Sequence, residues 1–384
     1  MRSEWRKVLV GDIYKTVSET YSNDSEYVVL VNTSDVLQGK LLNHEKVRNK
    51  NLKGQFKKTF QKNDILFSEI RPINQRNAFV DFEADDYIAS TKLMVLRPKD
   101  NTILPEYMFR FLNSHGVLRF LQSLAETRSG TFPQITFSEV AHLSMKLPPL
   151  PTQRVIVDTL SCLDAKIEVN NRIIKNLEEQ AQAIFKSWFI DFGPFQEGEF
   201  VESTLGNIPR DWKVGRLDDL MEITSGKRPG IREGLPINGI KVPVVGASKI
   251  MGYTNEVLFD DKIIVIGRVG THGVIQRFDY PCWPSDNTLV IKSHFYEFVY
   301  QSLKLVNFSA LNRGSTQPLI TQSDLKSLEI VIPPHRVLED YEKLASTLMS
   351  PARVNEKQNT TLATLRDTLL PKLMSGEIEV PIDQ

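Results

Sequence analysis

The chain has 384 residues and a mass of 43.8 kDa, which at roughly 100–200 residues per domain predicts two or three domains. Hydrophobic residues make up 41% and charged residues 24%, so packed cores are expected and wholesale disorder is excluded. Lys plus Arg (47) equals Asp plus Glu (47), so the net charge indicates no polyanionic partner. No stretch approaches the ~20 apolar residues of a membrane span, and the two cysteines lack a metal-ligand spacing. A soluble, cytoplasmic protein without structural zinc is expected.

Residues 1–150 are predicted to form a mixed α and β globule. Short stretches rich in Val, Ile and Phe, separated by Gly, Asn and Asp, are typical of strands. Residues 107–114 (YMFRFLNS) are expected to form one helix, followed by further loop. The globule carries six basic residues in thirteen positions without an acid, between Lys46 and Lys58. Such a run is often only a solvated loop, so it indicates a binding surface only in combination with other features.

A long helix is predicted over residues 151–192, after a Pro-Pro pair that cannot lie inside a helix. Its apolar positions follow the alternating spacing of four and three that is typical of a coiled-coil seam. An isolated stripe of this kind usually packs on its own domain. This helix would be about 50 Å long at ~1.5 Å per residue, so it should extend beyond a globule of 140 residues. The seam positions are Ile156, Leu160, Leu163, Ile167, Asn170, Ile174, Leu177, Ala181, Ile184 and Trp188.

Residues 193–335 are predicted to repeat the first globule. Residues 128–149 align without a gap on residues 313–334 at a constant offset of 185, with nine identical residues, and this self-similarity indicates a duplication. Looser matches pair Ser90 with Ser285 at an offset of 195 and Trp5 with Trp212 at an offset of 207. The growing offset means that the first copy carries about twenty extra residues, and we expect these to include the lysine-rich run.

A second long helix is predicted over residues 336–384. An offset of 185 transfers the seam to weaker residues, which include Leu348, Asn355, Leu362 and Leu369. Asn170 corresponds to Asn355, and a polar residue in a seam can fix its register. We therefore predict an α+β fold with two similar globules, separated by two long antiparallel coiled-coil helices in a pseudo-two-fold repeat. Pro351 and Pro371 predict that the second helix is kinked or begins late.

No pattern indicates catalysis. The chain lacks the usual nucleotide-binding, hydrolase, metalloprotease and amino-methyltransferase motifs, and no two histidines lie four residues apart. The nearest approaches to a metal-nuclease pattern are Asp164 with Lys166 and Asp324 with Lys326, and we expect both pairs on solvated helices. The chain is therefore predicted to bind rather than to react.

Duplex DNA is the predicted ligand. Residues 71–79 combine Arg, Asn and Gln, which can contact base edges through two hydrogen bonds. The second copy has glycine-rich loops with basic residues at 225–232 and 267–277, although their glycines can also serve tight turns. Two readers on a rigid spacer fit sites about 10 bp apart, and different loops predict an asymmetric site. The predicted DNA contacts are Lys50, Lys53, Lys57, Lys58, Arg71, Asn74, Gln75, Arg76, Asn77, Arg128, Lys227, Arg228, Arg232, Arg268, His272, Arg277 and Arg313.

The chain resembles the specificity subunit of type I restriction-modification enzymes over nearly its whole length. The matching segments are LPPLPTQRVI (147–156), AQAIFKSWFIDFGPF (181–195), STLGNIPRDWKVGRL (203–217) and LRDTLLPKLMSGEI (365–378). The resemblance implies two target-recognition domains, 1–150 and 193–335, that each read half of a bipartite DNA site. It also implies a non-catalytic role in antiviral defence, beside two methyltransferase subunits that supply S-adenosylmethionine chemistry and, in the complete enzyme, motor-nuclease subunits. Recognition loops vary most within this family, so no base contact is transferred.

Methyltransferase docking is predicted on the outer helix faces and on Phe185, Trp188 and Phe189, because these aromatic side chains exceed what one seam can bury. The alternative for these three residues is that they cap the domain junction. Two other functions stay open for the chain: a coiled-coil adaptor that binds only protein, and a self-contained DNA-modifying enzyme with an unrecognised site.

Overall fold

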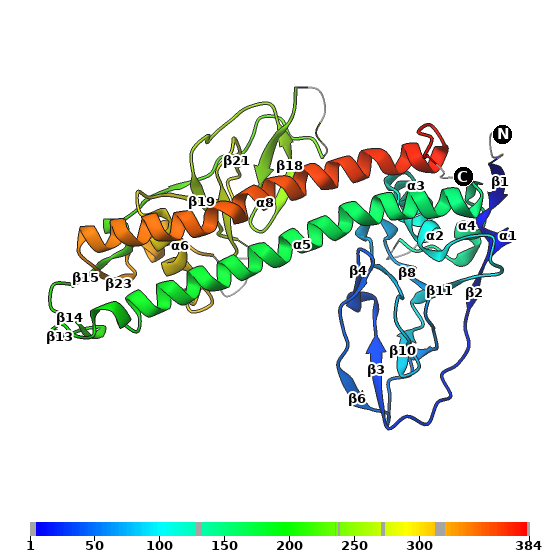
Figure 1. Ribbon diagram of the computed structural model, residues 1–384, viewed down its shortest axis with the longest axis horizontal. Coiled ribbons are helices and arrows are strands. Elements are labelled where there is room, and N and C mark those ends of the chain that lie inside the picture. Colours follow the sequence, from blue (N-terminus) through cyan, green and yellow to red (C-terminus); the bar gives the residue numbers. More distant parts are fainter. Residues whose placement is uncertain are drawn as a thin grey trace. The chain divides into compact units, whose positions relative to one another are not determined.

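The computed structural model describes residues 5–127, 133–234, 236, 239–269, 273–311 and 319–381 (Figure 1). The chain divides into two compact units, and each unit contains half of both long helices. Unit 1 comprises Met1–Val169 and Lys357–Gln384, and unit 2 comprises Asn170–Glu356. No helix in the described part of the chain is long and apolar enough to cross a membrane.

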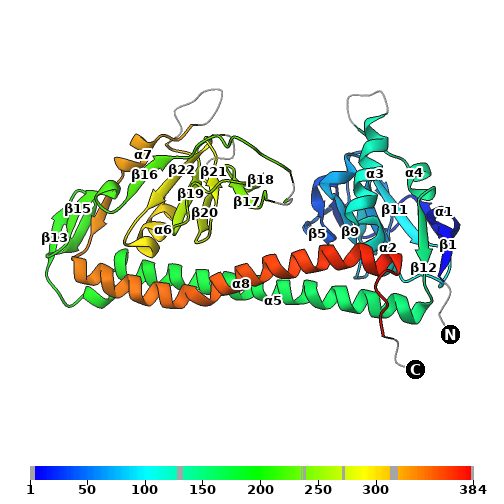
Figure 2. The same cartoon turned by 90° about the horizontal axis from the view of Figure 1, so that it is seen from above.

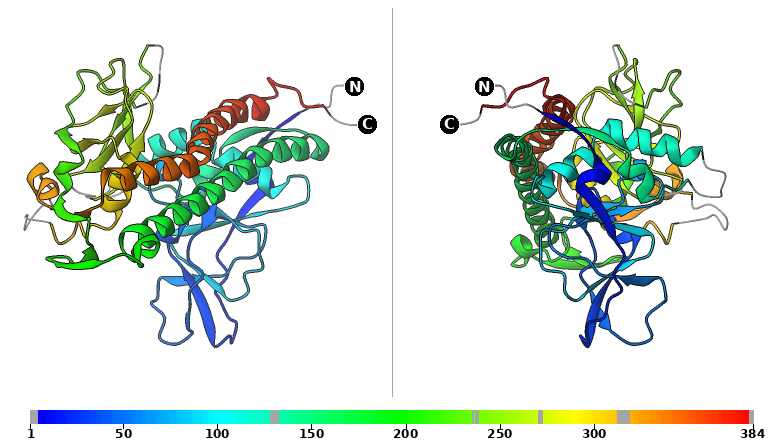
Figure 3. Two further views of the ribbon diagram at one scale, coloured as in Figure 1. Left: turned by 60° about the vertical axis from the view of Figure 1, so that its left-hand side comes forward. Right: turned by 90° about the vertical axis from the view of Figure 1, so that its right-hand side faces the viewer.

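Unit 1 contains an antiparallel and a mixed four-stranded sheet, together with two small strand pairs. The antiparallel sheet has the order β2 (Tyr14–Val17), β11 (Leu93–Pro98), β8 (Ile65–Ser68) and β9 (Asn77–Phe79). The mixed sheet has the order β6 (Lys46–Arg48), β3 (Tyr27–Val31), β10 (Tyr87–Ser90) and β7 (Phe56–Lys58), and β3 and β10 are parallel. The small pairs are β1 (Arg6–Leu9) with β12 (Ser144–Leu147) and β4 (Val36–Leu37) with β5 (Lys40–Leu41). Strands β3 and β6, which are blue in Figures 1 and 3, extend away from the part of α5 that belongs to unit 1.

The short helices of unit 1 cover the antiparallel sheet. They are α1 (Val10–Ile13), α2 (Pro105–Leu112), α3 (His115–Glu126) and α4 (Phe137–Ala141), and Figure 2 shows α2, α3 and α4 beside β11. The prediction of loop after residue 114 was wrong, because α3 forms there. Leu118, Leu121 and Ala125 lie three and four residues apart and are fully buried, so this segment has the apolar face of a helix.

Unit 2 repeats this plan. Its antiparallel sheet has the order β16 (Glu222–Ser225), β22 (Thr288–Lys292), β19 (Ile263–Gly267) and β20 (Ile275–Phe278). A second sheet has the order β18 (Ile250–Thr254), β17 (Val242–Val245) and β21 (Trp283–Pro284), with β17 and β21 parallel. The remaining elements are β13 (Phe200–Ser203), β14 (Gly206–Pro209), β15 (Lys213–Arg216), β23 (Glu329–Ile332), α6 (Tyr296–Lys304) and α7 (Gln322–Lys326). The repeat predicted from sequence is confirmed, down to the parallel strand pair in each unit.

The two long helices are α5 (Leu150–Phe189) and α8 (His335–Ser375), coloured green and orange to red in Figure 1. Of the two alternatives predicted for the second helix, a kink or a late start, the late start is excluded, because α8 starts directly after Pro334 and stays helical through Pro351 and Pro371. The side chain of Pro351 is exposed, so its ring lies outside the face of α8 that packs on α5. The start of α5 is anchored by the buried Gln153, whose Oε1 accepts from the Leu104 amide at 2.8 Å.

Within each unit, the halves of α5 and α8 pack against each other. In unit 1, Ile156 and Leu160 of α5 lie in one core with Leu373 and Met374 of α8. Arg366, which the offset of 185 from Ala181 also places in the predicted seam, pairs with Asp164 of α5 at 2.8 Å. In unit 2, Ile174, Leu177 and Ala181 pack with Leu348, Met349 and Ala352. The predicted α+β fold with paired antiparallel helices is confirmed.

The other predicted seam residues fall at graded depths. Asn170 is fully buried, while Leu163, Ile167, Ile184, Asn355, Leu362 and Leu369 are partly buried. Ile184 and Trp188 pack at the edge of the unit 2 core, and Leu369 packs at the edge of the unit 1 core. The side chains of the seam residues are thus buried to different extents.

Candidate nucleic-acid interface

The lysine-rich run of unit 1 occupies both edges of the mixed sheet. Lys46 begins β6, Lys58 ends β7, and the intervening loop joins these edge strands. Lys50, Lys53 and Lys57 are exposed, and no carboxylate in the described part of the chain pairs with them. These three ammonium groups are available to an external anion.

Lys58 has a structural role that its position in the run does not reveal. Its Nζ donates to the carbonyl oxygens of Thr91 at 3.0 Å and Leu93 at 2.8 Å. Burial lowers the pKa of this partly buried ammonium group. Lys58 therefore links β7 to β11, and its predicted role as a DNA contact is corrected on this ground.

Residues 71–75 form a tight, strained loop beside α3. Arg71 and Gln75 flank the short 3-10 helix Pro72–Asn74 and have φ values of 45° and 52°. Left-handed backbone in residues other than glycine costs free energy and concentrates at functional sites. The Arg71 amide donates to the Pro133 carbonyl oxygen at 3.1 Å, and the Gln38 amide donates to the Gln75 carbonyl oxygen at 2.9 Å. The loop is therefore fixed, with the side chains of Arg71 and Asn74 exposed.

The next two residues of this predicted contact set have partners within the protein. Arg76 donates from a guanidinium nitrogen to the Ser34 carbonyl oxygen at 3.0 Å. Asn77 is 1% exposed, and its Nδ2 donates to Asn113 Oδ1 at 2.6 Å. Asn77 is thus a buried residue of β9, like its neighbour Ala78. The prediction that it contacts DNA is corrected.

In unit 2, a basic loop follows β16. Lys227 and Arg228 are exposed, and Arg228 makes an ion pair with Asp286 at 3.5 Å. The loop is held by the Lys227 carbonyl oxygen, which accepts from Trp283 Nε1 at 2.7 Å. A Cβ on Gly226 would lie 2.2 Å from the Ser285 carbonyl oxygen, so this glycine permits a close backbone approach. Arg232 is also exposed.

Arg268 and Arg277 have opposite environments. Arg268 follows β19, is partly buried, and has an Nε that is buried without a hydrogen-bond partner among the described residues. Arg277 in β20 pairs with Glu178 at 3.2 Å and Glu297 at 3.5 Å, and its guanidinium lies 4.3 Å from the ring centre of Tyr300. Its side chain is 10% exposed, so Arg277 belongs to the core and its predicted role as a DNA contact is corrected. Arg128, His272 and Arg313 lie outside the described residues.

The aromatic cluster at the end of α5 is used within unit 2. Phe185 and Phe189 are 4% and 5% exposed and pack on Phe298 and Tyr341. Trp188 is partly buried beside Tyr341. The surplus aromatic surface that predicted a partner site at Phe185 and Phe189 is therefore absent, because their own unit covers these rings. The alternative, a cap at the end of the helix, fits these contacts.

The two candidate nuclease aspartates are helical, and both bond to other residues of the fold rather than standing free on a solvated face. Asp164 pairs with Arg110 and Arg366, and Asp324 is 3% exposed and accepts from the Thr321 amide at 2.9 Å. Both are engaged in the fold. The described residues contain no group of three or more His, Cys, Asp or Glu side chains that could hold a metal ion.

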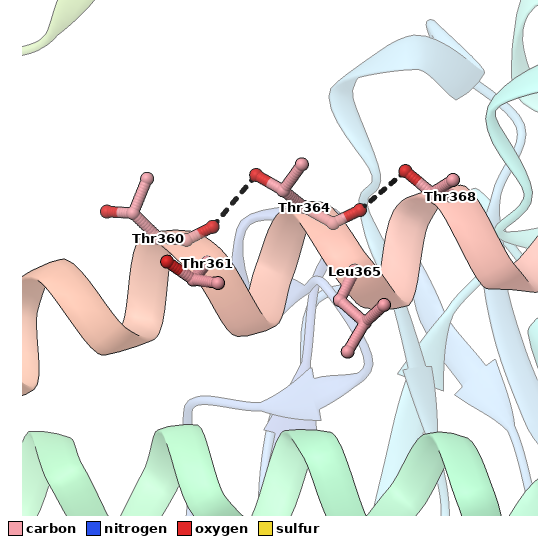
Figure 4. A pocket seen from close by; sticks show the side chains of 5 residues that line it. All are labelled: Thr360, Thr361, Thr364, Leu365 and Thr368. Carbon is pink, nitrogen blue, oxygen red and sulfur yellow. Dashed lines mark hydrogen bonds between the residues drawn. The ribbon is translucent and has the colours of Figure 1, made fainter.

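A shallow hollow of about 410 Å³ runs along α8 and is lined by Thr360, Thr361, Thr364, Leu365 and Thr368 (Figure 4). The hydroxyls of Thr364 and Thr368 donate to carbonyl oxygens one turn earlier, each at 2.8 Å. These polar groups are therefore turned back onto their own helix and do not converge on a ligand.

The fold and its basic loops define a class of protein: a duplicated binding module whose copies carry different loops and are built on paired long helices. The family model of the type I restriction modification DNA specificity domain matches residues 2–179 and 209–348, and the chain belongs to this family.

The relatives agree with this assignment. The specificity subunit of the type I restriction enzyme HindI from Haemophilus influenzae is 32% identical, over 98% of this chain and 100% of its own length. The MjaIX specificity subunit from Methanocaldococcus jannaschii is 26% identical over 84% and 79%. The solved type I S subunit from M. genitalium shares the fold, with a TM-score of 0.55 at 15% identity over 97% and 96%. The predicted resemblance is confirmed, and the relatives are specificity subunits rather than complete enzymes.

Proposed function

We propose that this chain reads a bipartite, asymmetric site in duplex DNA for a type I restriction-modification complex. Residues 1–150 and 193–335 act as two target-recognition domains, and each contacts one half of the site. One observation carries the proposal. The two units share one fold, but they carry their basic and amide side chains on different loops, after β8 in unit 1 and after β16 in unit 2. One scaffold with two loop sets fits a target whose halves differ in sequence.

The proposed contacts are the predicted residues whose side chains are exposed or make no hydrogen bond to another described residue. In unit 1 these are Lys50, Lys53, Lys57, Arg71, Asn74 and Gln75, and in unit 2 they are Lys227, Arg228, Arg232 and Arg268. Exposed lysines supply phosphate contacts, which set affinity, whereas Arg, Asn and Gln on fixed loops supply base contacts, which set sequence preference.

Two methyltransferase subunits, with S-adenosylmethionine bound to them and not to this chain, are the proposed partners, and motor-nuclease subunits join them in the complete enzyme. Support for a helix-face contact comes from unit 2, where apolar side chains of both long helices are exposed. Ile173 of α5 is 39% exposed, and Leu344 and Val354 of α8 are 42% and 63% exposed. The proposed place of action is the cytoplasm, where the DNA is accessible to the complex.

The decisive experiment first maps methylated bases in the host genome with and without this gene. A duplex with the mapped site is then titrated with the purified full chain, alone and with the methyltransferase subunits. The expected result is a split, asymmetric motif and an affinity whose logarithm falls steeply with the logarithm of salt concentration. An unchanged methylation pattern, or an affinity that stays flat with salt, would contradict the proposal.

Replacing Lys50, Lys53 and Lys57 together by Ala should weaken binding to every duplex and flatten the salt dependence. Each lost phosphate contact should reduce the slope of log K against log salt by roughly 1, so the slope should change by up to about 3. The matched control replaces Lys166, Lys175 and Lys343, three exposed lysines on the long helices. Equal effects of the two triple variants would show that bulk charge, and not the lysine-rich run, determines binding.

A further inference from the structure

One backbone position is shared by the two units and carries opposite charge in them. In unit 1 it is Glu69, the residue directly after β8. Its amide donates to the Lys92 carbonyl oxygen at 3.1 Å, and its carbonyl oxygen accepts from the Ile135 amide at 2.9 Å. The neighbouring Ile70 forms an isolated bridge with Gln134.

In unit 2 the corresponding residue is Arg268, directly after β19. Its amide donates to the Asn287 carbonyl oxygen at 3.0 Å, and its carbonyl oxygen accepts from the Ile320 amide at 3.0 Å. The neighbouring Val269 bridges Leu319. The sequence repeat pairs Lys92 with Asn287 and Ile135 with Ile320, so the hydrogen bonds of Glu69 and Arg268 are equivalent. Two copies of one scaffold therefore present a carboxylate and a guanidinium at the same point.

The guanidinium of Arg268 has no hydrogen-bond or ion-pair partner among the described residues. It is partly buried, its Nε is buried, and no described residue accepts a hydrogen bond from it. Residues 270–272 and 312–318 contain no Asp or Glu. Leaving a buried cationic donor unsatisfied is costly, so Arg268 needs an acceptor from beyond the described residues, and a bound ligand can supply it. A Cβ on Gly267 would lie 2.2 Å from the Ala247 carbonyl oxygen, so glycine at this point permits a close backbone approach directly before Arg268.

Glu69 is the counterpart with acceptor chemistry. It is partly buried, and no described side chain or amide donates to its carboxylate. Lys58 lies close enough for the charge of Glu69 to raise its pKa, which burial lowers. The Lys58 ammonium group nevertheless donates to the carbonyl oxygens of Thr91 and Leu93 and not to the Glu69 carboxylate. A carboxylate is repelled by phosphates. In a DNA interface it therefore favours a base edge, where the exocyclic amino group of cytosine, or of adenine, donates a hydrogen bond.

We infer that positions 69 and 268 determine sequence specificity: Arg268 contacts a guanine in the half-site of unit 2, and Glu69 accepts from the exocyclic amino group of a base in the half-site of unit 1. The inference rests on the proposed function and adds to it the chemical identity of one base in each half. It also gives a physical source for the asymmetry of the site, since equivalent positions read opposite hydrogen-bonding patterns.

The test maps the methylation motif of hosts that carry Arg268→Ala or Glu69→Gln, and then measures the affinity of each full chain for the mapped and altered duplexes. Arg268→Ala should relax one guanine in the unit 2 half-site and lose roughly 5- to 150-fold in discrimination at that base pair. Glu69→Gln should change the preference at one position of the other half-site only, because an amide can both donate and accept. Arg268→Lys keeps the positive charge but cannot make two hydrogen bonds to one guanine, so it should also reduce the preference for that guanine. This variant provides the test if Arg268→Ala does not fold.

The controls are Arg210→Ala and Glu83→Gln, two exposed members of surface ion pairs. They should leave both half-sites unchanged. Variants at 69 and 268 that weaken all duplexes equally, with an unaltered motif, would overturn the inference and leave the proposed function standing. A wild-type chain that prefers no split site would instead overturn the proposed function itself.

Discussion

Replacing Glu297 by Ala is expected to lower the free energy of unfolding of unit 2 by about 3–5 kcal/mol, because it leaves buried cations without their counterion. The Glu297 side chain in α6 is 1% exposed. Its carboxylate accepts from Lys262 at 3.3 Å, from Arg277 at 3.5 Å and from Arg353 of α8. A buried carboxylate that holds three cations is sensitive to truncation, since each partner is then left in a poorly solvated place.

The same group joins the sheet of unit 2 to both long helices. Arg277 in β20 also pairs with Glu178 of α5, and the Tyr300 hydroxyl donates to Glu178 at 3.4 Å. Burial raises the pKa of Tyr300 to about 12, so it stays a neutral donor. The ion network therefore links the antiparallel sheet and α6 of unit 2 to its halves of α5 and α8.

The measurement is denaturant unfolding of the full chain, followed by a signal from unit 2. The matched control is Glu199→Ala, which removes an exposed carboxylate from its pair with Arg210 and should cost less than about 1 kcal/mol. Glu297→Gln should fall between the two, because the amide keeps the shape and some hydrogen bonds but loses the charge. Equal losses for Glu297→Ala and Glu199→Ala would refute the network as a source of stability.

Unit 1 makes the corresponding link with other residues. Asp164 of α5 pairs with Arg110 of α2 and with Arg366 of α8. Under the offset of 185, Asp164 and Arg366 correspond to Met349 and Ala181, which pack together in unit 2. One copy thus uses an ion pair between the helices where the other uses an apolar contact. The difference explains why the predicted seam weakened at Arg366 without any loss of pairing.

The repeat, the long helices and their pairing were predictable from the sequence, because gapless identities and heptad spacing record backbone geometry directly. The direction of individual side chains was not. Arg268 and Arg277 lie nine residues apart in one glycine-rich segment, but Arg268 follows its strand whereas Arg277 lies within one and faces α6. Residue type alone cannot distinguish a cation that is buried by its own fold from one that is available to a ligand.

Two further discrepancies share this cause. Phe185 and Phe189 have the composition of a partner surface, yet rings from distant parts of unit 2 cover them. Glu69 is absent from the predicted DNA contacts because an isolated carboxylate, unlike a cation or an amide, does not by itself indicate DNA binding. It could have been found by comparing the residue after each central strand across the two copies, although that alignment needs the strand ends, which the loose sequence match in this region does not fix.

Replacing Phe189 by Ala should lower the free energy of unfolding by about 3–5 kcal/mol, because a buried ring is lost and a cavity remains. The Phe189 ring lies 4.8 Å from the ring centres of both Phe298 and Tyr341 and 5.9 Å from that of Trp212. It therefore joins the end of α5 to α6, to α8 and to the segment before β15. Deleting one ring should weaken all three contacts together.

The neighbouring Ile190 provides the control. It is 48% exposed, so Ile190→Ala should change stability by no more than about 0.5 kcal/mol. Denaturant unfolding of both variants separates the two roles that the aromatic cluster could have. If Phe189 is a core residue, Phe189→Ala lowers the free energy of unfolding of the purified chain, whether or not partner subunits are present. If Phe189→Ala kept the stability of the wild type but no longer bound the methyltransferase subunits, Phe189 would be a partner contact after all, and its burial in unit 2 would have to be relieved when the complex forms.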